Sequence, residues 1–407
     1  MLSLITFALA CLNAASSVTA LPQEVQPSSI FTSTSGFTGT GFTFSAGRSA
    51  VCLIGRISVS ASAQNIKILY SGPPNQLNAT QTIQELLAGA PTIYEETNGG
   101  PNKVSGTWTL STKLCFPADL IAASRVTTVQ LLTHGATLDQ TYWDFAPGYS
   151  YIDAAAKAGY ATFSYDRLGV GQSQHPDPIQ VVQAAIQVEI LHQLVLKLRS
   201  MPGLAGKLFQ NVVGVGHSAG STFTQALTQQ YPNDFDAVIL TGVSTSVATV
   251  SAGQAALNLQ IANQSPTNNG KFNGIGNGYF TPSTQTGLQF AFFKYPNFDP
   301  AILTSAFQKL QTNTLGELLT FGTLVGPAAS YTRPVQILNG NSDYVFCGGN
   351  CKLPSDQAAA ALGFFYPAVG DKGSTYLVPN TGHNINQHKS AGEAFAKHIE
   401  FLRKNKL

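Results

Sequence analysis

From Val126 to the C-terminus, short apolar runs typical of buried strands alternate with segments whose apolar residues recur at helical spacing. The predicted strands are residues 127–133, 160–165, 211–216, 237–241, 334–338 and 374–378, and the predicted helices are residues 151–158, 179–201, 218–231 and 391–404. Parallel strands need a long crossover between them, which a helix usually supplies. The alternation therefore predicts an α/β fold, with a mostly parallel sheet covered by helices on both faces.

Two stretches of the chain interrupt this pattern. Residues 21–125 are rich in Thr, Ser and Gly and contain short β-type runs such as Val51–Gly55, which predicts a β-rich N-terminal extension that packs on the main domain or forms a partly independent module. Residues 244–330 fall between two core strands and are rich in amide and aromatic side chains, which predicts an inserted cap. The core is then expected in two parts, residues 126–243 and 331–407.

Charge excludes one large class of function. Charged residues make up 10% of the chain, with 22 Lys and Arg against 20 Asp and Glu. A nucleic-acid-binding protein would need clustered basic residues, so nucleic acid is not an expected partner. No segment after residue 20 holds some twenty uninterrupted apolar residues, so stable membrane insertion is not expected either. The sequence carries no signal for an oligomeric state.

Residues 1–20 are typical of a signal peptide. Leu2–Leu12 is an apolar run too short to span a bilayer comfortably, and Val18-Thr19-Ala20 offers small residues for signal peptidase. We therefore expect an extracellular protein. Two sequons, at Asn78 and Asn263, are predicted glycosylation sites in such a protein.

The cysteines support secretion. Cys11 would leave with the signal peptide, and an even number of four remains, which predicts two disulfides. Cys347 and Cys351 have two glycines between them and form the natural local bridge, so Cys52 pairs with Cys115 by elimination. Half of a metal site is the alternative for Cys347 and Cys351, but no second close Cys pair exists and His is sparse. No metal or other cofactor is expected.

Ser218 is the predicted nucleophile. It stands at the centre of Gly216-His217-Ser218-Ala219-Gly220, a G-x-S-x-G pattern, after a predicted strand and before a predicted helix. This pattern forms a sharp turn that exposes the serine at the strand end, and residues two positions away must be small to avoid clashes. A glycine-rich turn without reactivity is the alternative.

A serine hydroxyl needs a base, and His383 is the best placed histidine. It follows the last predicted strand, on a loop at the same sheet edge as Ser218, whereas the rival His388 lies at the approach to the final helix. The acid that orients the base should follow a late strand, and Asp343 does so, with Asp356 and Asp371 as alternatives.

Acyl transfer also requires donors for an oxyanion. The amide of Ala219, directly after the nucleophile, is one candidate. The second is expected in the loop after the first core strand, at Ala136, with Gly135 as the alternative. His134 in the same loop is expected to hold the loop by a hydrogen bond.

The order of the motifs resembles a known family. They are His134-Gly135, Asp166-Arg167-x-Gly169-x-Gly171-x-Ser173, Gly216-x-Ser218-x-Gly220, Asp343 and Gly382-His383. This order is similar to that of the α/β-hydrolase superfamily, and the chain looks like a secreted fungal serine hydrolase of that group. The resemblance covers roughly the last two-thirds of the chain. It implies that Ser218, Asp343 and His383 form a catalytic triad, and it leaves the N-terminal extension unexplained.

These observations predict a serine hydrolase that cleaves carboxylic esters in two acyl-transfer steps. The aromatic and amide-rich cap favours a small, largely uncharged and partly apolar substrate. A peptidase, lipase or lyase on the same scaffold is one alternative, because this fold hosts many reactions. A secreted binding protein without activity is the other.

Overall fold

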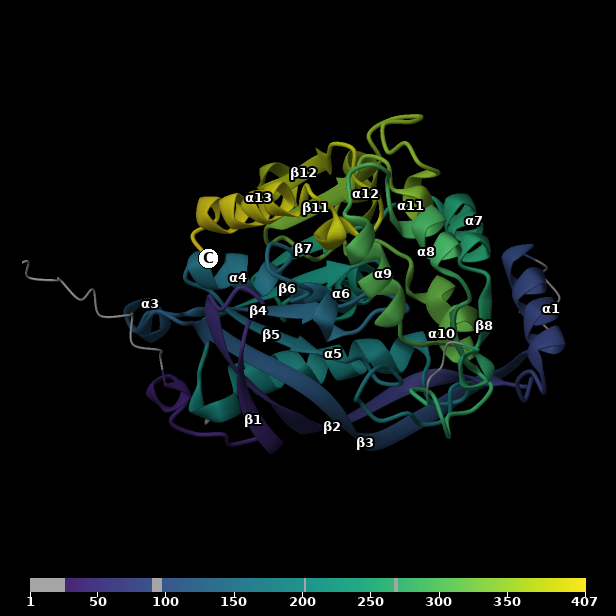
Figure 1. Ribbon diagram of the computed structural model, residues 1–407, viewed down its shortest axis with the longest axis horizontal. Coiled ribbons are helices and arrows are strands. Elements are labelled where there is room, and N and C mark those ends of the chain that lie inside the picture. Colours follow the sequence, from purple (N-terminus) through teal and green to yellow (C-terminus); the bar gives the residue numbers. More distant parts are fainter. Residues whose placement is uncertain (1–25, 90–96, 201–202, 267–269) are drawn as a thin grey trace, which may run out of the picture.

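The computed structural model describes residues 26–89, 97–200, 203–266 and 270–407, built around a nine-stranded sheet (Figure 1). In spatial order its strands are β1 (Thr38–Phe44), β2 (Ala50–Ile68), β3 (Asn98–Pro117), β5 (Ala161–Tyr165), β4 (Thr128–Thr133), β6 (Asn211–His217), β7 (Ala237–Thr241), β11 (Val335–Gly340) and β12 (Gly373–Val378). All neighbours from β5 to β12 are parallel, and β1, β2 and β3 add on antiparallel. The predicted fold class is confirmed.

Apolar residues on alternate sides of the core strands hold helices on both faces of the sheet. Val212 of β6 packs in the same cluster as α5 (Ala184–Arg199), α6 (Ala219–Gln230) and α12 (Gln357–Phe365), whereas its neighbour Val213 packs with α4 (Tyr151–Lys157) and α13 (Ala391–Lys404). Successive side chains of a strand point to opposite faces, so this near-continuous apolar run buries both faces. Because the strands from β5 to β12 run parallel, their carboxyl ends lie together at one edge of the sheet.

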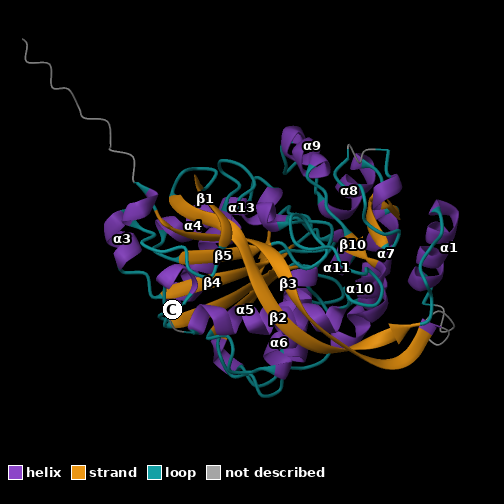
Figure 2. Cartoon of the chain, turned by 90° about the horizontal axis from the view of Figure 1, so that it is seen from below, coloured by secondary structure: helices purple, strands orange, loops and turns teal. Residues whose placement is uncertain are grey.

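The N-terminal region joins the same sheet through the pairing of β3 with β5. Strands β2 and β3 form a long antiparallel pair in which Cys52 lies opposite Cys115 and is bonded to it. The β-type runs at residues 51–55 and 66–70 belong largely to one strand, β2. The residues between them, rich in Ser and Ala, continue the strand, and every second one is buried. Figure 2 shows β2 and β3 curving from the core toward α1 (Gln76–Leu87).

Residues between β7 and β11 form a cap over the strand ends. Its elements are α7 (Val247–Leu257), β8 (Leu259–Ile261), η4 (Ala262–Gln264), β9 (Tyr279–Pro282), α8 (Gln285–Phe292), α9 (Pro300–Gln308), β10 (Asn313–Thr314), α10 (Leu315–Thr320) and η5 (Phe321–Leu324). The cap strands make a separate sheet, in the order β10-β9-β8. The far end of the N-terminal region contacts this cap, where the Ile261 amide donates to Gln76 Oε1 at 2.8 Å.

Shorter elements complete the described residues. They are η1 (Pro27–Ser29), α3 (Leu120–Ser124), η2 (Gln140–Trp143), η3 (Leu204–Gly206), α11 (Tyr344–Cys347), η6 (Gly370–Lys372) and η7 (Ile385–Gln387). A helix of the length and apolar character needed to cross a bilayer does not occur in the described ranges.

Candidate active site

Ser218 lies at the abrupt junction of β6 and α6, in a strained backbone conformation. Its φ is 55° and its ψ is −120°, a combination that residues with a side chain rarely adopt. The turn is possible because its flanking residues are glycines. A Cβ on Gly216 would stand 2.6 Å from the Gly220 carbonyl oxygen, and a Cβ on Gly220 would stand 2.0 Å from the Thr133 carbonyl oxygen. The side chain of Ser218 is partly exposed, while both neighbouring residues are buried.

His383 and Asp343 form a buried hydrogen-bonded pair beside this turn. His383 Nδ1 lies 2.7 Å from Asp343 Oδ2. An ionised carboxylate only accepts hydrogen bonds, so Nδ1 carries the hydrogen and Nε2 is left free to accept a proton. The ring of His217, which directly precedes Ser218, lies 4.9 Å from the His383 ring, centroid to centroid. This distance places the base beside the nucleophile turn.

Asp343 is held by the loop that follows β11. Its Oδ1 accepts the Phe346 amide at 2.9 Å, so the side chain caps the short helix α11 as well as binding His383. The Cys347–Cys351 disulfide closes the loop directly after this helix, and the Cys351 amide donates to the Asn341 carbonyl at 2.9 Å. The local bridge therefore fixes the segment that carries the acid.

The loop after β4 approaches the nucleophile closely. A Cβ on Gly135 would stand 3.0 Å from the Ser218 Cβ, tighter than most Cβ contacts, so glycine favours this approach. Ala136 follows in this loop, and Ala219 is the first residue of α6, where an amide has no acceptor within its own helix. Both predicted oxyanion donors thus belong to segments that flank Ser218.

His134 ties this loop to its neighbour. Its Nδ1 donates to the Gly135 carbonyl at 2.9 Å and its Nε2 accepts the Arg167 amide at 3.0 Å. Burial, followed by the positive charge of Arg167, lowers the pKa of His134 well below its usual range. A neutral ring with both nitrogens engaged has the structural role that the sequence predicts for it.

The rival residues have other roles. His388 Nε2 accepts the amides of both Lys294 and Gly382, at 3.0 and 3.1 Å, and its Nδ1 donates to the Asn384 carbonyl, so neither nitrogen is free to act as a base. Asp356 caps α12 through the Ala358 and Ala359 amides. Asp371 lies in η6, before β12 begins.

A buried ion pair joins the cap to the core, and sequence reasoning missed it. Arg167, from the Asp166–Ser173 motif, pairs with Glu317 of α10, and both side chains are fully buried. Gln187 Nε2 also donates to Glu317 Oε1 at 2.8 Å. Since 150 residues separate the partners, no local pattern signals the pairing. The same cap segment reaches the loop after β4, where the Gln311 amide donates to the Thr137 carbonyl at 2.9 Å.

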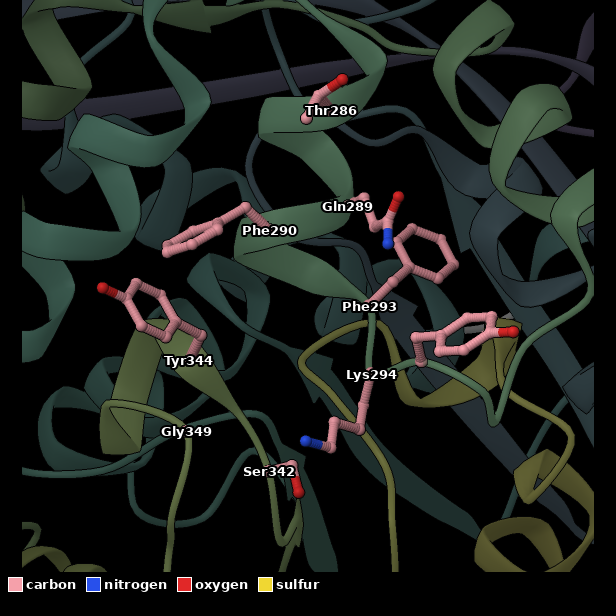
Figure 3. Close-up of a pocket in the computed structure, with 9 residues that line it drawn as sticks. Thr286, Gln289, Phe290, Phe293, Lys294, Ser342, Tyr344 and Gly349 are labelled. Carbon is pink, nitrogen blue, oxygen red and sulfur yellow. The ribbon is translucent and has the colours of Figure 1, made fainter.

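A surface pocket of about 380 Å³ lies between α8 and the loop that carries Asp343. Figure 3 shows Phe290, Phe293 and Tyr344 around it, with Lys294 reaching toward Ser342. Neither Ser218 nor His383 lies among the described residues that line it. The pocket is therefore next to the Asp343 loop but separate from the proposed reaction centre.

The remaining predicted sites lie away from this centre. Both predicted disulfides, Cys52–Cys115 and Cys347–Cys351, are formed. Asn78 is exposed on α1, whereas Asn263 is partly buried and donates to the Ile275 carbonyl at 2.6 Å. The predicted signal peptide lies outside the described residues. Within the described part of the chain, no group of three or more His, Cys, Asp or Glu side chains could hold a metal ion.

Comparisons with known proteins identify the family. Residues 130–398, more than half of the chain, match the model of the alpha/beta hydrolase family. Comparison with curated protein sequences found no match. An esterase from Thermogutta terrifontis is similar in structure, with a TM-score of 0.51 and 16% identity over 74% of this chain and 94% of that one. Rv0554 from Mycobacterium tuberculosis has a TM-score of 0.50 and 14% identity, over 74% and 96%. Both likenesses concern the fold, and the family match shows that this chain belongs to the alpha/beta hydrolase family.

Proposed function

We propose that this chain is a secreted serine hydrolase that cleaves carboxylic esters of largely uncharged, partly apolar substrates through an acyl-enzyme on Ser218. One observation carries the proposal: a strained serine at the junction of β6 and α6 lies next to a buried His383–Asp343 pair. Strain in a backbone persists where function requires the conformation, and here it presents a hydroxyl at the end of the sheet.

The mechanism follows from the placement of these groups. His383 Nε2 takes the hydroxyl proton as Ser218 Oγ attacks the ester carbonyl, and the protonated ring then gives that proton to the departing alcohol. Asp343 keeps the hydrogen on Nδ1 and stabilises the cationic ring. In this proposal the amides of Ala219 and Ala136 bind the oxyanion. Water, deprotonated by His383, then releases the acid from Ser218.

The surroundings of His383 support a partly apolar substrate. The rings of Phe292 and Phe346 lie 5.0 and 5.6 Å from the His383 ring, centroid to centroid. Phe292 comes from the cap and Phe346 from the loop after β11. Apolar walls with a few convergent polar groups are typical of sites for small, uncharged ligands.

A fluorophosphonate probe and ester kinetics test the proposal. We expect the probe to label wild-type protein and not Ser218→Ala, and p-nitrophenyl acetate to give a burst of one nitrophenol per site, because the acyl-enzyme accumulates. Asp343→Asn should remain folded and lose about 10⁴-fold in kcat, since the asparagine favours the wrong tautomer of the base. Folded wild-type protein that escapes the probe, or that cleaves peptides or cyanohydrins and no ester, would refute the proposal.

Secretion needs a separate test. The two disulfides support an oxidising compartment, and Asn78 on the surface of α1 is accessible to glycosylation. Expression of the full chain in a eukaryotic secretory host should release protein into the medium that starts near Leu21. Amino-terminal sequencing checks the cleavage, and a mass decrease after glycosidase treatment, absent from Asn78→Gln, checks the glycan. Protein that stays inside the cell with residues 1–20 still attached would contradict the predicted secretion.

A further inference from the structure

Two buried polar side chains at the junction of the cap and the loop after β4 have no hydrogen-bond partner among the residues that the structure describes. In Asn313 of β10, neither the amide nitrogen nor the amide oxygen has a partner in the described chain. In Thr137, the hydroxyl has none there either. Each residue is only 1% exposed. Buried polar groups in folded proteins are nearly always hydrogen-bonded, so each exception needs a reason.

A backbone hydrogen bond joins the segments that carry the two residues. The Gln311 amide, two residues before Asn313, donates to the Thr137 carbonyl at 2.9 Å. Thr137 follows Ala136, the proposed oxyanion donor, and the same loop approaches Ser218 at Gly135. Asn313 and Thr137 therefore stand on the two sides of a single contact between the cap and the oxyanion loop.

The side chain of Asn313 points to the opposite side of its segment from the neighbouring side chains of Thr312 and Thr314. The hydroxyls of Thr312 and Thr314 donate to the carbonyls of Gly169 and Val182, at 2.6 and 2.8 Å, and so face the core loop below. Successive strand residues point to opposite faces, which directs Asn313 to the other side of β10. There it is paired with Phe280, in the apolar cluster that also contains Phe292, the ring beside His383.

The backbone of Thr137 is also unusual. Its φ is 59°, in the left-handed region that a β-branched residue strongly disfavours. A strained residue whose buried hydroxyl has no acceptor in the described chain is costly for the fold, and such features gather at ligand-binding sites. The strain and the two polar groups are independent observations that point to one place.

We propose that Asn313 and Thr137 form a polar subsite for a hydroxyl group of the substrate, on the cap side of the loop that carries the proposed oxyanion donor. The Asn313 amide can both donate to and accept from a hydroxyl, and Thr137 adds a further donor. The inference rests on the proposed ester hydrolysis at Ser218 and names the substrate class: esters that bear such a hydroxyl on their acyl or on their alcohol part. A site built to bind a hydroxyl discriminates strongly against an analogue that lacks it.

Matched ester pairs test the subsite and distinguish the two sources of the hydroxyl. Ethyl 3-hydroxybutanoate against ethyl butanoate probes the acyl side, and 2-hydroxyethyl butanoate against propyl butanoate probes the alcohol side, with acid release followed in a pH-stat. We expect kcat/KM of wild-type enzyme to favour the hydroxylated ester at least about 10- to 100-fold in one of the two pairs.

The decisive variant is Asn313→Leu, which is similar in size and apolar. It should reduce the preference to about one, because kcat/KM falls much more for the hydroxylated ester than for the plain ester. Asn277→Leu is the matched control, because its amide donates to the carbonyls of Pro73 and Pro74 and not toward the site, and it should keep the wild-type preference. Should Asn313→Leu not fold, Asn313→Ala removes the same amide and provides the same comparison.

The outcomes separate this inference from the proposed function. Equal rates within each wild-type pair, or a preference that survives Asn313→Leu, would overturn the subsite while esterase activity stands. Failure of the fluorophosphonate to label wild-type Ser218, together with no cleavage of any ester, would remove the proposed function instead. Fluorophosphonate labelling of Ser218 in Asn313→Leu, measured beside the Asn277→Leu control, reports on the reaction centre separately from the subsite.

Discussion

Removal of Glu317 should destabilise the protein strongly, because it would leave a buried charge without its counter-ion. Arg167 is fully buried and pairs with Glu317 through Nη1, while Nε and Nη2 have no partner within the described chain. In Glu317→Leu the guanidinium would lose that acceptor and remain in the interior. Breaking a buried pair in this way costs about 3–5 kcal/mol, several times the value of an exposed pair.

Urea unfolding followed by tryptophan fluorescence measures this cost. With a slope on the order of 4 kcal/mol per M for a chain of this size, the midpoint of Glu317→Leu should fall by roughly 1 M. The double variant Arg167→Met with Glu317→Leu removes both charges and should recover to within about 1 kcal/mol of wild type. Glu400→Leu breaks the exposed Lys397–Glu400 pair and should leave the midpoint unchanged.

The reasoning fails under either of two results. A loss below about 1 kcal/mol in Glu317→Leu would mean that water or rearrangement compensates the guanidinium. A double variant no more stable than the single one would mean that Glu317 acts through packing or through its bond from Gln187, rather than through charge.

Three further predictions concern the turn, the long bridge and acid stability. Gly220→Ala would put a Cβ 2.0 Å from the Thr133 carbonyl oxygen, so fluorophosphonate labelling of Ser218 should be lost, and labelling at the wild-type rate would contradict the steric argument. Cys52 and Cys115 are 63 positions apart in the sequence, and their disulfide restricts the unfolded chain. Replacing both by Ser should therefore lower the free energy of unfolding by about 4 kcal/mol; an unchanged urea midpoint would refute this. Burial lowers the pKa of His388 from its usual 6.5 to about 4. Between these two pH values the unfolded chain binds a proton at His388 and the folded chain does not, so the free energy of unfolding falls by about 3 kcal/mol as the pH drops from 6.5 to 4. His388→Gln should lose correspondingly less in urea unfolding at low pH, and an equal loss would assign the acid sensitivity elsewhere.

Local chemistry explains why so much of the core could be predicted from sequence. Strand β7 and helix α13 begin and end where the apolar patterns place them, because both elements bury a continuous apolar face. The nucleophile turn could be recognised from the five residues Gly216 to Gly220, although the contact that requires glycine at position 220 is with Thr133 of the neighbouring strand β4. Asp343 and His383 could be proposed because parallel strands bring their carboxyl ends to one edge.

Long-range partners were beyond sequence reasoning. The pairing of Arg167 with Glu317 depends on how the cap folds back, and no local pattern in residues 244–330 encodes that path. The length of β2 was missed for a different reason: its centre is built from Ser, Ala and Gln, which are too weakly apolar to mark the side that packs inward until the rest of the fold is known. The positive φ of Thr137 likewise leaves no mark on the composition of its segment.

The attachment of β3 to β5 limits how this enzyme could be shortened or recombined. The family match begins at residue 130, yet a fragment cut there would expose the whole hydrogen-bonding edge of β5 that β3 now covers. An exposed strand edge with unpaired backbone N–H and C=O groups can pair with strands of other chains, which leads to aggregation. A chimera or minimal catalytic fragment should therefore start upstream of β1, at Pro27, and carry the disulfide-linked hairpin as part of the scaffold.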